Sequence, residues 1–219
     1  TNIGNVYIDT GDWEQAETNL RQSFEIAQRI ANPYEVAQAY LNLGRLYLSQ
    51  QLWEPSQSHL DAAIALYKQA GAHASPGLID AYLLQGQLCL EQGNVNAAVE
   101  WSAQSYSLLH EMTGKTTRES TEWGRYAQLM GRIATAQGDT DQALEHLKQA
   151  KSIFEASRTH LEVGRTAQYC AQVWLSLSNA TKAHAKLAEA QHIFAQLGAM
   201  PDLYRAEQAL TDLAIPVST

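Results

Sequence analysis

Hydrophobic residues recur along the chain at the spacing of one face of an α-helix. Leu60, Ala63, Ile64 and Tyr67, for example, follow the i, i+3, i+4, i+7 rule. Stretches of this kind come in pairs that are separated by short polar turns. The pattern therefore predicts pairs of helices of about 15–18 residues each.

The helix pairs form a repeat. Each copy is anchored by one small residue, and the anchors are Gly4, Gly44, Gly86, Gly131 and Ala171, at intervals of 40, 42, 45 and 40 residues. A turn follows seven residues after each anchor, at Gly11-Asp12, Gln51-Leu52, Gly93-Asn94, Gly138-Asp139 and Ser178-Asn179. Gly followed by Asp or Asn is typical of a helix end and the N-cap of the next helix. The second helix of each copy then carries spaced small and large residues, as at Ser56, Leu60 and Ala63.

The repeat positions that always hold a small residue, such as the anchor, have a physical explanation. A large side chain would push two crossing helices apart, so a close crossing requires Gly or Ala. Gly in a helix interior costs about 1 kcal/mol relative to Ala, and four copies accept that cost at the anchor. We therefore expect each anchor to lie where the two helices of a copy touch.

These residues resemble the tetratricopeptide repeat. Leu43-Gly44 with Tyr47 matches its first helix, and Ser56, Leu60 and Ala63 match its second. The resemblance covers essentially the whole chain, although the usual period is about 34 residues. The spacing here is longer, so either each helix is longer by about a turn or the connections between copies are extended.

The resemblance implies an all-α, right-handed superhelical solenoid of about five helix pairs plus a closing helix. It implies one domain over residues 1–215, followed by a tail at 216–219. The expected copies lie near 1–31, 34–71, 76–113, 119–157 and 160–198, and the expected closing helix lies at 201–215.

Extended repeats of this kind are similar to those of multidomain bacterial regulators of the LuxR and maltose-activator type, and to those of kinesin light chains. The segment 193–199 is similar to the end of such regulator arrays. Only three residues precede Gly4, so we expect further repeats or another domain before this chain. The resemblance implies a non-catalytic protein–protein interaction module within a larger regulator.

Composition narrows the class of partner. The net charge is −8 and the isoelectric point is about 5.3, which argues against direct binding to nucleic acid or an anionic membrane. No apolar run approaches the length of a membrane span, and the first residues carry no signal peptide pattern. The two cysteines define neither a disulfide framework nor a zinc site, which fits a reducing compartment. We therefore expect a cytoplasmic protein.

The sequence carries no familiar catalytic, cofactor or metal motif. His184 and His192, the nearest histidines on one helix, are too far apart around that helix to share a metal ion. Cys89 and Cys170 lie in helical patterns and are interpreted as core residues. We expect no enzyme activity, no cofactor and no metal. The tryptophans and tyrosines either pack between adjacent helices or form an aromatic slot for a peptide side chain. Trp123 lies outside the repeat consensus, so it is the aromatic residue to test first as a contact for a partner.

Three columns of the first helices, at six and three residues before the anchor and one residue after it, form the candidate site together with Asn42. In this class of repeat, the first helices line the concave face, where a partner peptide or helix binds. The candidate residues are Asn42, Arg45, Gln87, Arg125, Gln128, Arg132, Arg165, Gln168, Gln172, Arg205 and Gln208. Stacked repeats would place Arg125, Arg165 and Arg205 in a row beside three glutamines.

Two interpretations of this row remain open. Arg binds carboxylates through a planar fork, and Gln can bond to a peptide backbone, so the row predicts a groove for an acidic or C-terminal peptide. Alternatively, the arginines only solvate the inner face or pair with Glu122, Glu162 and Asp202, three residues upstream of each.

One known variant of the family, the clamp for chaperone C-termini, is incomplete here. Asn5 and Asn42 fall on its asparagine positions, but Thr1, Asp80 and Leu84 replace its basic residues. The sequence therefore predicts no chaperone binding. Two other functions compete with the interaction module: a receptor for a small signalling peptide or molecule, and a structural spacer that self-assembles.

Overall fold

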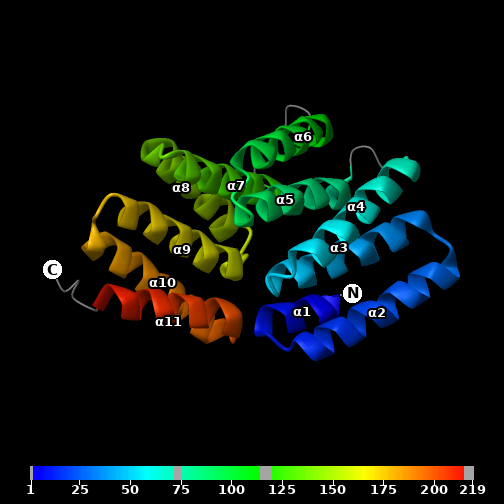
Figure 1. Ribbon diagram of the computed structural model, residues 1–219, viewed down its shortest axis with the longest axis horizontal. Helices are drawn as coiled ribbons and strands as arrows, with labels where there is room; N and C mark the ends of the chain where they lie inside the picture. Colours follow the sequence, from blue (N-terminus) through cyan, green and yellow to red (C-terminus); the bar gives the residue numbers. More distant parts are fainter. Residues whose placement is uncertain (1, 72–74, 114–119, 215–219) are drawn as a thin grey trace. The chain divides into compact units, whose positions relative to one another are not determined.

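The computed structural model describes residues 2–71, 75–113 and 120–214, and all regular structure in these ranges is helical. The two helices of a pair run antiparallel and lie side by side (Figure 1). Their bounds are α1 Asn2–Thr10, α2 Trp13–Ile30, α3 Pro33–Ser49, α4 Trp53–Gln69, α5 Pro76–Glu91, α6 Val95–Thr113, α7 Thr121–Gln137, α8 Thr140–Ala156, α9 His160–Ser176, α10 Ala180–Leu197 and α11 Met200–Ala214.

The all-α fold class and the paired helices are confirmed. From α3 to α11 the helices are 15 to 19 residues long, so much of the extra period lies in the helices themselves. The two longest spacings between anchors, 42 and 45 residues, coincide with the longer connections after α4 and after α6. The predicted tail at 216–219 lies outside the described residues.

The chain divides into two compact units. One contains Thr1–Ile8 with Asp12–Arg118, and the other contains Asp9–Gly11 with Glu119–Thr219. The first unit holds three helix pairs, and the second holds two pairs followed by α11. The prediction of one solenoid domain over residues 1–215 stays a prediction.

The anchor glycines lie at the closest approach of the two helices of a pair. A Cβ at Gly44 would lie 2.8 Å from Leu60 Cδ2, and a Cβ at Gly131 would lie 2.7 Å from Leu147 Cγ. Leu60 and Leu147 are fully buried in the cores of their respective units. The predicted reason for the small column is therefore confirmed at these two positions.

A second glycine column lies seven residues before the anchor in the second unit. A Cβ at Gly124 would lie 2.6 Å from the ring of Phe154, and a Cβ at Gly164 would lie 2.7 Å from the ring of Phe194. Both rings are fully buried between the two helices of their pair. These glycines let α7 and α9 pack directly on an aromatic ring.

The turns within the pairs share one backbone shape. The residue that ends the first helix has a left-handed backbone at Gly11, Gly93 and Gly138, with φ between 76° and 82°. Gln51 and Ser178 take the same conformation, with φ of 61° and 54°. The next residue then caps the second helix, as Asp139 does by accepting a hydrogen bond from the Gln142 amide at 3.0 Å.

Candidate functional site

The structure places every candidate residue on the first helix of a repeat. Asn42 and Arg45 lie on α3 and Gln87 lies on α5, all in the first unit. In the second unit, the α7 residues are Arg125, Gln128 and Arg132, the α9 residues are Arg165, Gln168 and Gln172, and the α11 residues are Arg205 and Gln208. We describe the two groups separately.

In the second unit, Arg165 is held by carboxylates of two successive repeats. Its Nη1 lies 2.8 Å from Glu162 Oε1 on the same helix. Its Nη2 and Nε donate to Asp202 Oδ2 of α11, at 2.8 and 3.1 Å. Because Asp202 is buried, with only 4% of its side chain exposed, these bonds are shielded from water.

The same two carboxylates bind further members of the row. Asp202 Oδ1 accepts a 2.7 Å hydrogen bond from Nη2 of Arg205 on its own helix. Glu162 Oε2 accepts a 3.2 Å hydrogen bond from Nε2 of Gln128 on α7. Gln128 also donates to the Thr166 hydroxyl at 2.9 Å. We call Arg125, Gln128, Glu162, Arg165, Asp202 and Arg205 the charge ladder, because their side chains connect α7, α9 and α11.

The electrostatics of the ladder are those of a stable ion-pair network. Burial alone would raise the pKa of Glu162, but Arg165 and Arg125, with hydrogen bonds from Arg165 and Gln128, hold it below its ordinary value. Burial alone would lower the pKa of Arg165, but Glu162 and Asp202 hold it well above its ordinary value. Glu162 and Arg165 are therefore both charged at neutral pH.

The row of Arg125, Arg165 and Arg205 is therefore not a purely cationic surface. The arginine row is interleaved with acidic side chains, so Arg165 binds within the protein rather than presenting a fork to a ligand. The pairing with residues three positions upstream, one of the two predicted interpretations, occurs at Glu162 with Arg165 and at Asp202 with Arg205. Arg205 differs from Arg165, because half of its side chain remains exposed.

The remaining candidates of the second unit lie nearer the C-terminal ends of α7, α9 and α11. The guanidinium of Arg132 stacks on the ring of Tyr169, at 4.6 Å from the ring centroid. Gln168 is half-buried, whereas Gln172 and Gln208 are exposed. The exposed pair offers amide donors and acceptors to solvent or to a partner.

In the first unit, polar side chains again join successive first helices. Arg45 Nη2 on α3 donates to Asp80 Oδ2 on α5 at 3.3 Å. Asn5 Nδ2 on α1 donates to Asn42 Oδ1 on α3 at 3.5 Å, which is a long hydrogen bond. Among the described residues, Asn5 Oδ1 and Asn42 Nδ2 have no partner although both atoms are buried. This amide pair thus holds one unused acceptor and one unused donor.

Trp123 does not lie where a partner could reach it. The sequence selected it as a contact, but the structure places it in the first turn of α7 with 2% of its surface exposed. Its ring packs edge-to-face on Tyr126, with centroids 5.7 Å apart. Trp123 is therefore a core residue, and its selection as a partner contact was wrong.

The cysteines lack the features of nucleophiles. Cys89 is buried and Cys170 is half-buried, and burial raises the pKa of both thiols.

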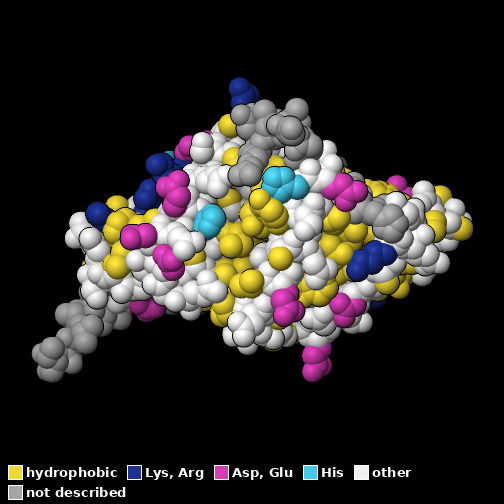
Figure 2. Space-filling view, turned by 90° about the horizontal axis from the view of Figure 1, so that it is seen from above, with side chains coloured by type: hydrophobic (Ala, Val, Ile, Leu, Met, Phe, Trp, Pro, Cys, Tyr) yellow, Lys and Arg dark blue, Asp and Glu magenta, His cyan; other side chains and the backbone are white. Residues whose placement is uncertain are grey.

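Within residues 2–71, 75–113 and 120–214, no cluster of three His, Cys, Asp or Glu side chains could hold a metal ion. Over the same ranges, no helix has the length and apolar character needed to cross a bilayer. The described basic side chains visible in Figure 2 are scattered among acidic and neutral ones.

The sequence model of a family described as tetratricopeptide repeat matches residues 1–69 and 35–110, which together make up half of the chain. No curated protein matches the sequence.

Solved structures with the same fold include several repeat proteins. BtubC (BKLC) from P. vanneervenii is 16% identical, with a TM-score of 0.62 over 89% of this chain and 78% of that one. A putative kinesin light chain from Podosopora anserina, with nearly identical TPR-like repeats, is 16% identical, with a TM-score of 0.56 over 89% of this chain and 93% of that one. Aspartyl phosphate phosphatase F from Bacillus subtilis is 16% identical, with a TM-score of 0.63 over 96% of this chain and 56% of that one. At this identity, the likeness establishes the fold alone.

Proposed function

Because the chain belongs to the tetratricopeptide repeat family, whose members generally serve protein–protein interaction, we propose that it is a non-catalytic module that binds a segment of a partner protein along its first helices. The proposal includes a place within a larger cytoplasmic regulator, for which the resemblance of segment 193–199 is the support.

The observation that carries the proposal is the Asn5–Asn42 pair. An extended peptide offers alternating N–H donors and C=O acceptors along its backbone. The pair holds one unpartnered acceptor, Asn5 Oδ1, and one unpartnered donor, Asn42 Nδ2, on two successive first helices. Leaving both atoms buried and unpaired is unfavourable by about 1–3 kcal/mol each. Asn42 is only 1% exposed, so a peptide backbone reaches the pair through the half-buried Asn5, and it satisfies both atoms only by opening the long Asn5–Asn42 bond.

The second unit supports a different role for its arginines. Arg165 holds α9 against α11 and is a positioning residue for the row. Arg205 keeps half of its side chain exposed, so it is the arginine of the ladder that we propose as the contact for an acidic side chain of the partner.

The experiment is a binding assay with arrays of random peptides, neutral and acidic, read with the labelled full chain. Peptides that bind are remeasured in solution with Asn42→Ala and Asn5→Ala. We expect each variant to weaken binding by about tenfold, the effect of losing one hydrogen bond. Arg205→Gln should weaken only the acidic peptides.

The matched control is Gln149→Ala, which removes an exposed amide from α8, a second helix. Circular dichroism confirms that each variant is folded. An array without binding peptides, or peptides that bind both asparagine variants as tightly as the unmodified chain, would overturn the proposal.

A further inference from the structure

Helix α11 presents a face that the other first helices of its unit keep closed. In α7 and α9, the column seven residues before the anchor is glycine, covered by Phe154 or Phe194 of the second helix. A 40-residue step from Gly164 leads to Tyr204, and the same step from the anchor Ala171 leads to Thr211. Tyr204 is 64% exposed and Thr211 is exposed. A tyrosine at this column keeps a second helix from packing as closely as α10 packs on α9.

This face is a continuous stripe. Met200, Tyr204, Gln208 and Thr211 follow one another at helical spacing along the exposed side of α11. Met200 is 56% exposed, so two large side chains of the stripe are open to solvent. We call these four residues the α11 stripe.

The margin of the stripe carries opposite charges at its two ends. Arg205 and Asp212 are seven residues apart, so they lie on the same side of α11, two turns from each other. Both are exposed. The named hydrogen bonds of Arg205, to Asp202 and to the Pro201 carbonyl, use Nε and Nη2, two of the three nitrogens of its guanidinium.

We propose that the α11 stripe is the contact between two copies of this chain, packed antiparallel about a twofold axis that passes near Gln208. In this arrangement, each Arg205 lies opposite Asp212 of the second copy, so the charge contact is made twice. Parallel packing would instead place the Arg205 and Asp212 side of one copy against the Glu207 side of the other, so Arg205 and Asp212 would not meet. The match of Arg205 with Asp212 therefore supports a second α11 as the occupant, in the antiparallel direction.

One margin of the stripe opposes the contact. Glu207 lies on the side away from Arg205 and Asp212, and it accepts a 3.3 Å hydrogen bond from Gln191 Nε2. Twofold packing brings the two copies of Glu207 toward each other across the axis. One helix per chain also buries less area than the roughly 1,200 Å² of a standard interface. The dimer is accordingly weak and reversible.

Sedimentation equilibrium of the full chain, over about 10 µM to about 1 mM, tests the proposal. We expect the mean mass to rise toward twice that of the monomer. Arg205→Glu and Asp212→Arg should each weaken dimerisation at least tenfold, because like charges then face each other. The double variant with both changes should restore it, since the pair is only reversed. Glu207→Gln should strengthen the dimer.

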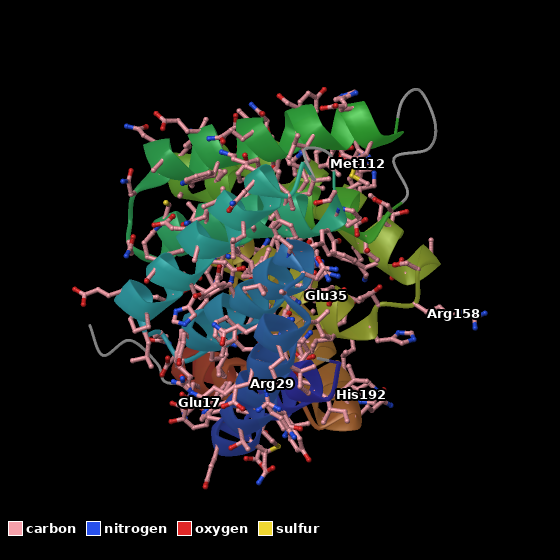
Figure 3. All side chains as sticks on the ribbon, turned by 90° about the vertical axis from the view of Figure 1, so that its right-hand side faces the viewer. Glu17, Arg29, Glu35, Met112, Arg158 and His192 are labelled. Atoms are coloured by element: carbon pink, nitrogen blue, oxygen red, sulfur yellow. The ribbon has the colours of Figure 1, made fainter. Side chains whose placement is uncertain are left out.

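The matched control is Arg158→Glu, which reverses a charge at the turn between α8 and α9, where Arg158 points away from the ribbon (Figure 3). This variant should dimerise like the unmodified chain, and circular dichroism confirms that each variant is folded. A chain that stays monomeric over the whole range overturns the proposal. So does a dimer that tolerates Arg205→Glu, or one that the charge reversal fails to restore.

Discussion

Asp202 shows how one side chain can hold two repeats together. It is nearly fully buried, yet it is bound by Arg165 of the preceding repeat and by Arg205 of its own helix. A buried carboxylate is stable only when charged donors replace its lost water, and here two guanidinium groups do so. Glu162 is held in the same way by Arg165 and Gln128. The ladder therefore stabilises contacts between repeats as well as contacts within a helix.

The lowered pKa of Glu162 predicts a pH dependence of stability. A carboxyl whose pKa is lower in the folded state contributes stability above its ordinary pKa, and loses it as pH falls through the folded value. We expect the unmodified chain to lose this contribution from about pH 5 downward. Glu162→Gln should lower the unfolding free energy at pH 7 by about 1–3 kcal/mol, and less at low pH.

Urea denaturation at a series of pH values measures this difference. Glu145→Gln, at an exposed position on α8, is the control and should leave the unfolding free energy at pH 7 nearly unchanged. An equal loss of stability for Glu162→Gln at pH 7 and pH 3 would show that the charge of Glu162 contributes nothing.

At the scale of the helix, the repeat pattern predicted much of the fold. The anchor column marked the contact of the two helices of a pair, because only a small residue fits above Leu60 or Leu147. The turns were recognisable since Gly and Asp have strong backbone and capping preferences. Gln51-Leu52 and Ser178-Asn179 follow the same geometry, and there the repeat spacing located the turn.

Other features were not predictable from one sequence. Glycine fills the column of Gly124 and Gly164 in two repeats only, so the packing of α7 and α9 on aromatic rings left no full column to recognise. The i, i+3 partners of the arginines were visible in the sequence, but the reach of Arg165 to Asp202 depends on how α9 and α11 pack. Trp123 was misassigned because its burial depends on contacts that periodicity does not encode.

Among the described turns within helix pairs, the one between α3 and α4 has neither a glycine nor a side-chain cap, which leads to a stability prediction. Gln51 adopts a left-handed backbone that costs a non-glycine residue roughly 1 kcal/mol. Leu52 is the N-cap of α4 but has no side-chain hydrogen bond, although its backbone shape matches that of Asp139. Gln51→Gly and Leu52→Asp should each raise the unfolding free energy by about 1 kcal/mol.

Urea denaturation of the two variants measures these gains. The reverse changes at the matched turn, Gly138→Ala and Asp139→Ala, should lower the unfolding free energy by similar amounts. No change in either Gln51→Gly or Leu52→Asp would mean that this turn does not limit the stability of the chain.

At the scale of the whole molecule, each compact unit has its own core. In the first unit, Leu60, Ala63 and Tyr67 pack between successive repeats. In the second, Phe154 and Phe194 occupy comparable places, and the charge ladder joins its three first helices. Stability in repeat proteins is close to a sum of contacts between neighbours, so a unit with complete internal contacts can fold alone.

We therefore expect residues 119–219, expressed alone, to fold into a helical unit with a cooperative unfolding transition. The core clusters around Phe154 and Phe194 and the six ladder residues lie within this piece, which lacks only Asp9–Gly11 of the unit and with them the 3.2 Å ion pair of Arg165 with Asp9. Circular dichroism during thermal unfolding is the measurement. Residues 1–52, which hold α3 without its partner α4, are the control and should not unfold cooperatively. Non-cooperative melting of residues 119–219 would show that the second unit depends on the first.

The ladder also bears on how such a chain can grow. Each first helix of the second unit carries an acidic residue and, three positions later, an arginine. Arg165 of α9 donates a hydrogen bond to Asp202 of the next first helix, α11. Glu162 of α9 accepts a hydrogen bond from Gln128 of the preceding first helix, α7. Duplication of the segment α9–α10 would therefore copy both Glu162, which binds the preceding first helix, and Arg165, which binds the following one. The inserted copy would meet a matching hydrogen-bond partner on either side, so gene duplication or deliberate splicing could lengthen this unit without new side chains at the junctions.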